Sequence, residues 1–204
     1  MERNKIMQNL LNRYPKLEAC KEDIENALRL VIDTYENGGK ILVCGNGGSA
    51  ADSEHIVGEL MKGFVSKRTV KNENIPFEIK KHLQGALPAI SLPSQVAVLS
   101  AYINDVEPEM MYAQLVYGYG RKEDLLIGLS TSGNSKNVVN AVKVANALGM
   151  KTLSLTGENG GALARISNVT VKVPETETYK VQEYHLPVYH YLCLKAEEHF
   201  FQQN

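Results

Sequence analysis

Hydrophobic positions along the chain repeat with two periods, and the alternation between them predicts the fold. Apolar residues from Leu10 to Tyr35 follow helical spacing with one break at Tyr14-Pro15, which predicts two helices over residues 1–37. From residue 40 onward, short apolar runs of strand length alternate with segments of helical spacing. This alternation is typical of a parallel sheet that helices cover on both faces. Strands are predicted over residues 40–44, 86–92, 124–129, 151–156 and 168–173, and helices from an N-cap at Ser49 to Met61, over 95–102, 108–117 and 138–148, and over 179–201 with an interruption at Pro187.

Residues 63–85 do not follow this alternation. Basic residues such as Lys67, Arg68 and Lys71 are interleaved there with polar residues, and Pro76 interrupts what periodicity there is. We expect an excursion or flap with a short helix near residues 77–83. The chain as a whole, residues 1–204, is interpreted as a single α/β domain with extra helices at both ends.

Composition excludes several classes of partner. Lys and Arg number 22 against 23 Asp and Glu, for a net charge of −1, so no general basic field attracts nucleic acid or a membrane surface. The sequence has no apolar run of about 18 residues, the length of a membrane-spanning helix.

The three cysteines, Cys20, Cys44 and Cys193, are widely spaced and odd in number. They argue against a disulfide framework and favour a location in the reducing cytoplasm.

Two predicted strand-to-helix loops carry the strongest chemical signal. Residues 45–49 (Gly-Asn-Gly-Gly-Ser) and residues 130–135 (Ser-Thr-Ser-Gly-Asn-Ser) join strand ends to helix N-termini, where backbone N–H groups and the helix dipole favour an anion. Either loop alone fits turn and capping needs equally well. The four hydroxyls of the second loop favour phosphate, and neither loop matches a dinucleotide or P-loop pattern. We therefore expect the bare phosphate of a small molecule.

A second group of polar residues lies on predicted helices. His55 and Glu59 are four residues apart and project from one helix face, a spacing more typical of a solvated contact than of a ligand pair. Two polar residues on one face of a buried helix need polar partners, and the last helix offers Gln182 and His190. Glu183 and His185 lie close by, so the pattern alone does not select among these four.

Taken together, these motifs closely resemble those of the sugar isomerase (SIS) domain family, and in particular the phosphoheptose isomerases. The resemblance covers essentially the whole chain and implies a five-stranded parallel sheet, a homotetramer with active sites between subunits, and a sugar-phosphate substrate. The matching stretches are residues 44–49, His55-x-x-x-Glu59, Asn104-Asp105, residues 130–135, residues 155–157 with Gly160-Gly161, and Gln182-Glu183-x-His185 followed by His190.

The resemblance also implies roles for individual residues. Glu59 and His190 match the catalytic acid/base pair, and zinc is the implied cofactor, a metal suited to two imidazoles, a carboxylate and an amide oxygen. The implied zinc ligands are His55, Glu59, Gln182 and His190. The implied substrate-binding residues are Asn46, Gly47, Gly48, Ser49, Asn104, Asp105, Ser130, Thr131, Ser132, Ser135 and Gln182.

Two departures from the family pattern concern the sugar. Met61-Lys62-Gly63 stands where the family usually has Thr-Gly-Arg, so a basic sugar contact either moves to Lys62 or is absent. In the family, an Asp commonly precedes the stretch Arg-Ile-Gln-Glu, whereas this chain has Tyr179-Lys180-Val181 before Gln182. In addition, residues 63–85 form a longer excursion than expected.

The resulting hypothesis is an aldose–ketose isomerase that interconverts sedoheptulose 7-phosphate and a mannoheptose 7-phosphate through an enediol. The alternative is a non-catalytic SIS tetramer that serves as a protein-binding scaffold, a class that typically lacks the Glu found here as Glu59. Both terminal helical regions are apolar on more than one face, so we expect subunit contacts to bury them. Gln182 and His190 are then expected to approach His55 and Glu59 from a neighbouring subunit.

Overall fold

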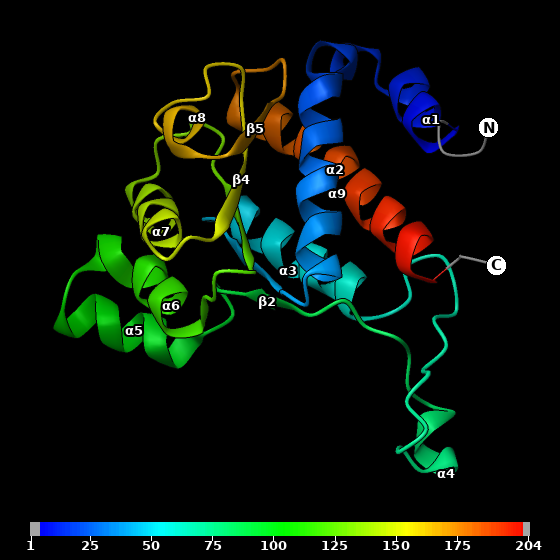
Figure 1. Ribbon diagram of the computed structural model, residues 1–204. Coiled ribbons are helices and arrows are strands. Elements are labelled where there is room, and N and C mark those ends of the chain that lie inside the picture. Colours follow the sequence, from blue (N-terminus) through cyan, green and yellow to red (C-terminus); the bar gives the residue numbers. More distant parts are fainter. Residues whose placement is uncertain (1–4, 202–204) are drawn as a thin grey trace.

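A parallel sheet of five strands forms the centre of the molecule, as expected, in a computed structural model that describes residues 5–201 (Figure 1). The strand order is β2-β1-β3-β4-β5, so β1 and β3 are neighbours near the middle. Val43 in β1 lies opposite Ser91 in β2 and Ile127 in β3. The strands are Ile41–Cys44 (β1), Ala89–Ser91 (β2), Leu125–Leu129 (β3), Lys151–Thr156 (β4) and Val169–Lys172 (β5).

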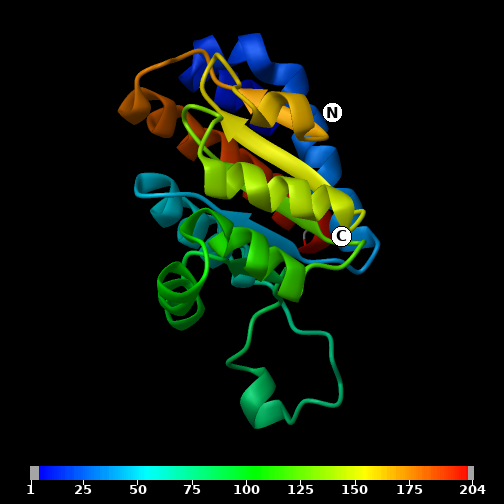
Figure 2. The ribbon, with the colours of Figure 1, turned by 90° about the vertical axis from the view of Figure 1, so that its left-hand side faces the viewer.

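Helices cover both faces of the sheet because successive side chains of each strand point to opposite sides. In β1, Ile41 and Val43 join one buried cluster with α2, α3 and α9, whereas Leu42 and Cys44 join another with α6 and α7. Figure 2 looks onto this second face, with α6 and α7 in front of the sheet and the helices of the first face behind it. The helices are Lys5–Arg13 (α1), Lys21–Glu36 (α2), Gly48–Met61 (α3), Phe77–Lys80 (α4), Val96–Asp105 (α5), Met111–Tyr119 (α6), Lys136–Ala147 (α7), Leu163–Ile166 (α8) and Thr178–Phe201 (α9), with 3-10 turns at Pro15–Cys20 (η2) and Pro108–Met110 (η3).

Three details of the sequence interpretation change. Residues 15–20 form a 3-10 turn between the two N-terminal helices, so this region is not a simple helix pair. α9 continues through Pro187 without interruption. The strand predicted over 86–92 is observed only over Ala89–Ser91. Pro88 has no N–H to donate to a neighbouring strand, and β2 lies at the edge of the sheet.

The terminal helices find their packing partners within the chain. α2 and α9 pack against each other, and both contribute to the core on one face of the sheet, including Ile24, Val31 and Leu192. Packing within the chain therefore covers part of the apolar surface of both helices, and the expectation that subunit contacts bury them stays a prediction. Within residues 5–201, no helix combines the length and apolar character needed to cross a membrane.

Residues 63–85 leave the end of α3 and return to β2 as a long arm that projects from the body of the molecule (Figure 1). Its short helix, α4, falls within the predicted range, and Phe77 at its start is 77% exposed. Two contacts close the base of the arm: Gly63 N donates to Gln84 Oε1 at 2.7 Å, and Gly85 N donates to Arg68 O at 2.9 Å. The arm is thus a closed excursion with a pinned base.

Candidate active site

The two small-residue loops lie side by side because they follow adjacent strands. Residues 45–49 follow β1, and residues 130–135 follow β3. The side-chain amides of Asn46 and Asn137 exchange two hydrogen bonds of 2.9 Å, which link the first loop to the start of α7 after the second loop. Carboxyl ends of parallel strands are where open α/β sheets bind ligands, so both loops border one site.

The first loop makes a tight entry into α3. Gly47 has a φ of 56°, a conformation that L side chains rarely adopt, and it caps a helix that begins at Gly48. Ser49 is therefore not the N-cap that the pattern predicts but a buried residue inside the first turn. A Cβ at Gly48 would lie 2.7 Å from Gln182 Nε2, so the absence of a side chain lets the Gln182 amide from α9 lie against the loop.

The second loop is organised by its own hydroxyls. Ser130 Oγ and Ser135 Oγ are 2.9 Å apart, and Ser132 Oγ accepts a hydrogen bond from Asn134 N at 3.1 Å. Gly133 has a φ of 67°, and a Cβ there would lie 2.1 Å from the carbonyl oxygen of Gly160. The Thr131 carbonyl accepts from Gly157 N at 3.0 Å. The loop after β4 thus braces the serine loop, which is the candidate anion cradle.

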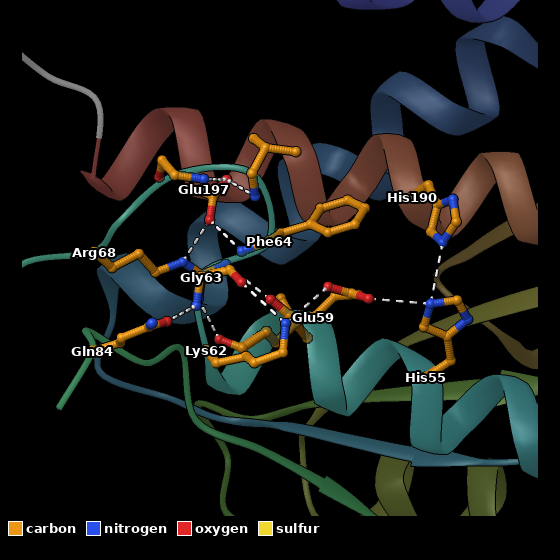
Figure 3. A network of polar contacts seen from close by, with 12 residues as sticks. His55, Glu59, Lys62, Gly63, Phe64, Arg68, Gln84, His190 and Glu197 are labelled. Carbon is orange, nitrogen blue, oxygen red and sulfur yellow. Dashed lines mark hydrogen bonds and ion pairs between the residues drawn. The ribbon is translucent and has the colours of Figure 1, made fainter. Parts of the chain in front are cut away.

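His55, Glu59 and His190 come together where α3 packs against α9 (Figure 3). His55 Nε2 lies 3.2 Å from Glu59 Oε1 and 3.4 Å from His190 Nε2. These contacts form within one chain, so the expectation that His190 reaches His55 from a neighbouring subunit is wrong: α3 and α9 are direct packing partners. Gln182, on the same helix, also lies against α3 of its own chain.

Tyr189 and Asp52 support His55 from behind, and the sequence interpretation missed both. The buried Tyr189 hydroxyl donates to Asp52 Oδ1 at 3.1 Å and lies 3.0 Å from His55 Nδ1. With its own proton donated to Asp52, the Tyr189 oxygen can accept from His55 Nδ1, which favours the tautomer in which Nε2 keeps a lone pair. The signal for this contact that the sequence offered was Asp52, which lies three residues, about one helical turn, before His55.

The donor set around His55 Nε2 has the chemistry of a cation site. A lone pair on His55, the Glu59 carboxylate and a ring nitrogen of His190 face one another, and Glu59 Oε2 is buried without a hydrogen-bond partner. Ligands of tetrahedral zinc lie about 3.3–3.6 Å apart, close to both distances measured from His55. Among residues 5–201, no group of three or more His, Cys, Asp and Glu side chains is arranged so that it could hold a metal ion. The residue types of this cluster fit zinc, and two of the pairwise distances are near those of a tetrahedron, but the side chains as placed do not form a metal site.

Electrostatics distinguish the residues of this cluster. Burial lowers the pKa of His190, and the nearby His55 lowers it further, so His190 is held in its neutral form. Burial raises the pKa of Asp52, although the hydrogen bond from Tyr189 acts in the opposite direction. Lys62, to which a basic sugar contact would move, places its ammonium 3.9 Å from Glu59 Oε2.

The remaining candidates lie in different surroundings. Asn104 and Asp105 end α5, are exposed, and bond to each other at 2.8 Å. His185 is fully buried, and neither ring nitrogen has a hydrogen-bond partner. Glu183 is exposed. Of the two histidines left open by the pattern, the structure brings His190 to His55 and buries His185 in the core.

Comparisons with known proteins show likeness over most of the chain. A model of the SIS domain matches residues 5–157. A phosphoheptose isomerase of Helicobacter pylori strain P12 is 42% identical over 188 residues, which cover 92% of this chain and 90% of the relative. That alignment spans most of the chain, well beyond the part matched by the domain model.

Solved structures show the same likeness. A phosphoheptose isomerase from Francisella tularensis superposes with a TM-score of 0.78 at 31% identity, covering 96% of each chain. One from Neisseria gonorrhoeae gives a TM-score of 0.73 at 30% identity, covering 96% of this chain and 99% of the other.

Proposed function

Because the chain belongs to the SIS-domain family of phosphoheptose isomerases and is a sugar-phosphate isomerase, we propose that it interconverts sedoheptulose 7-phosphate and D-glycero-D-manno-heptose 7-phosphate. One observation carries this proposal: Glu59 and His190 both lie beside His55. His55 and Glu59 are on α3, the helix that starts at the glycine loop, and His190 is on α9. A phosphate at the two loops would direct the other end of a sugar along α3. This separation of anion binding from proton transfer suits an open-chain sugar phosphate.

The reaction moves a proton between C1 and C2 of the open-chain sugar through an enediol. In our proposal Glu59 acts as the base at one of these carbons, and His190 acts as acid or base at the other. The lowered pKa of His190 supports this role, since a neutral imidazole can accept a proton at neutral pH. Each positioned acid or base typically contributes a rate factor of about 100 to 10,000. Lys62 is in place to contact the sugar from the side of Glu59.

Zinc is the cofactor that this donor set supports. His55, Glu59, Gln182 and His190 would hold it, and when bound it would polarise the sugar oxygens as a Lewis acid. The lone pair that Tyr189 leaves on His55 Nε2 is the feature of this chain that favours a metal over a simple hydrogen bond.

We also propose that the protein works as a homotetramer in the cytoplasm. α5 is an apolar helix without a buried residue, and Val96 and Ile103 are 71% and 45% exposed. An exposed apolar face of this kind favours contact with a further subunit. The three cysteines are free and buried, in keeping with a reducing compartment.

Product analysis tests the proposed reaction. Purified full-length protein is incubated with sedoheptulose 7-phosphate and, in parallel, with fructose 6-phosphate, and products are followed by NMR with and without added zinc. We expect a mannoheptose 7-phosphate from the first substrate. Absence of turnover on every ketose phosphate in a wider panel would favour the scaffold alternative.

Two variants test the acid/base pair. Glu59→Gln and His190→Ala should each lower turnover by at least about 100-fold, because each removes a proton-transfer group. Binding of inorganic phosphate at the serine loop should be unchanged in both. Turnover above a tenth of the parent value in both variants would contradict the assignment.

A further inference from the structure

A buried ion pair joins the arm to α9 directly behind the end of α3. Arg68 Nε donates to Glu197 Oε1 at 2.8 Å, and both side chains have an exposure of 0% (Figure 3). Glu197 also accepts from three successive backbone N–H groups, those of Phe64, Val65 and Ser66, at 2.8, 3.0 and 3.2 Å. These donors and the guanidinium lower the pKa of Glu197 against the effect of burial and keep it ionised.

The other arms of the Arg68 guanidinium reach back to α3. One terminal nitrogen donates to Leu60 O at 2.5 Å, and the other donates to Glu59 O at 2.8 Å. The last carbonyls of a helix have no partner in the helix itself and carry the negative end of its dipole. Arg68 thus closes the C-terminal turn of α3, and one of the two carbonyls it binds belongs to Glu59.

The same two helices meet at the proposed reaction centre. His190 and Glu197 are seven residues apart, about two helical turns, so they lie on one face of α9. His190 meets His55 near the middle of α3, and Glu197 holds the end of α3 through Arg68. Glu59 lies on the last turn of α3, four residues after His55, and its own carbonyl belongs to the second attachment.

We propose that Arg68 and Glu197 are positioning residues that hold the Glu59 carboxylate at the distance from His55 and His190 that proton transfer requires. The inference rests on the proposed acid/base role of Glu59. Neither side chain is in reach of the sugar, since both are fully buried, so their effect passes through the backbone of the last turn of α3. A shift of about 1 Å at a reacting group can lower a rate by about 100-fold.

A purely structural role would give a different result, and a second buried pair provides the control. Asp124 is 3% exposed, lies 2.5 Å from Lys40 Nζ, and accepts from the backbone N–H groups of Lys40 and Arg121. Like Glu197, it is a buried carboxylate with one basic partner and backbone N–H donors, although Lys40 is partly exposed and the donors number two instead of three. Lys40 and Asp124 precede β1 and β3, so the pair lies at the opposite end of the strands from the loops.

The experiment measures kcat, KM and thermal unfolding for Glu197→Gln, Arg68→Lys and Asp124→Asn. We expect kcat to fall about 10- to 100-fold in the first two variants with KM within about 3-fold, because the phosphate loops stay in place. Asp124→Asn should lower the unfolding temperature and leave kcat within about 3-fold of the parent. Arg68→Lys keeps the charge and loses the guanidinium fork, so it remains decisive if Glu197→Gln does not fold.

The inference is overturned if Arg68→Lys keeps kcat within about 3-fold of the parent, or if Asp124→Asn lowers kcat as much as Glu197→Gln does. Glu59→Gln is measured alongside to distinguish failure of the acid/base role from failure of the positioning role. If Glu59→Gln stays active, the acid/base role itself fails. If it is inactive while Arg68→Lys turns over normally, only the positioning role fails.

Discussion

The Nε2 atoms of His55 and His190 lie 3.4 Å apart, although the two residues are separated by 135 positions in the chain. Two imidazole nitrogens at this distance share at most one proton, so at least one of them offers a lone pair to the other or to a cation. Glu59 Oε1 lies 3.2 Å from the same atom of His55. The contact between α3 and α9 therefore brings two imidazole rings and a carboxylate together. The packing of two helices thereby produces a candidate site that neither helix contains alone.

Tyr189→Phe tests how His55 is prepared for this centre. Loss of the hydroxyl removes the acceptor for His55 Nδ1 and lets the ring adopt the other tautomer, in which Nε2 carries the proton. We expect zinc affinity, measured by competition with a chromogenic chelator, to fall about 10- to 100-fold. Tyr35→Phe is the matched control, since the Tyr35 hydroxyl contacts Pro88 O at 3.3 Å, away from the cluster. Equal zinc affinity in both variants would argue against the tautomer assignment.

Ser132→Ala and Ser135→Ala test the anion cradle. Each should weaken binding of sedoheptulose 7-phosphate by about 1–3 kcal/mol, because a hydrogen bond to a charged group is lost. Affinity is measured by calorimetry in the Glu59→Gln background, where turnover does not interfere. Ser100→Ala serves as the control, since its hydroxyl contacts Ala97 O on the exposed surface of α5. If neither loop variant changes the affinity, the phosphate binds elsewhere.

His185 predicts a pH dependence of stability. Burial lowers its pKa from 6.5 to about 4, so the unfolded chain takes up a proton at a pH where the folded chain does not. The free energy of unfolding therefore falls as the pH drops from about 6.5 toward 4, and this group alone should make it about 2 kcal/mol lower at pH 5 than at pH 7.

Urea unfolding of the parent, His185→Leu and His82→Gln at both pH values isolates this contribution. The Leu variant should lose most of the difference, and His82→Gln, at an exposed position of the arm, serves as the control. An unchanged pH dependence in His185→Leu would show that the ring is not held neutral in the fold.

The exposed apolar face of α5 predicts that charged substitutions there lower the oligomeric state. Val96 and Ile103 are seven residues apart and share a helix face, so Val96→Asp and Ile103→Asp place charge on it. Light scattering should give four times the formula mass for the parent and a smaller mass for each variant. Lys71→Asp, at an exposed position of the arm, should leave the mass unchanged. A parent protein of single formula mass would refute the proposed assembly.

Much of the fold was predictable because its signals are local. The apolar run 124–129 is buried on both faces as β3, and the change to helical spacing after each loop marks α3 and α7. Family motifs then supplied the number of strands, which the structure confirms. Helix starts were less accurate, since Gly47 takes the capping position that a hydroxyl residue was expected to fill.

Long-range packing was not predictable from these patterns. The apolar faces of α2 and α9 indicated a need for cover, but periodicity does not say whether the cover belongs to the same chain. The roles of Tyr189 and Arg68 were missed for a related reason: each depends on contacts with residues distant in sequence or outside regular structure. A tyrosine beside a histidine on a helix has no signature until the opposite helix is known.

The contacts at the base of the arm hold its two ends together whatever the length of its outer part. Since Arg68 O and Gly85 N already close the loop, we expect changes in the length of residues 69–83 to leave the register of the strands unchanged. Loop-closure entropy grows slowly with length, and each doubling costs only about 0.6 kcal/mol. For protein engineering, this arm is the natural insertion point for a fluorescent reporter or an affinity handle, and for protease mapping it is the place to look for the first cut in the native state.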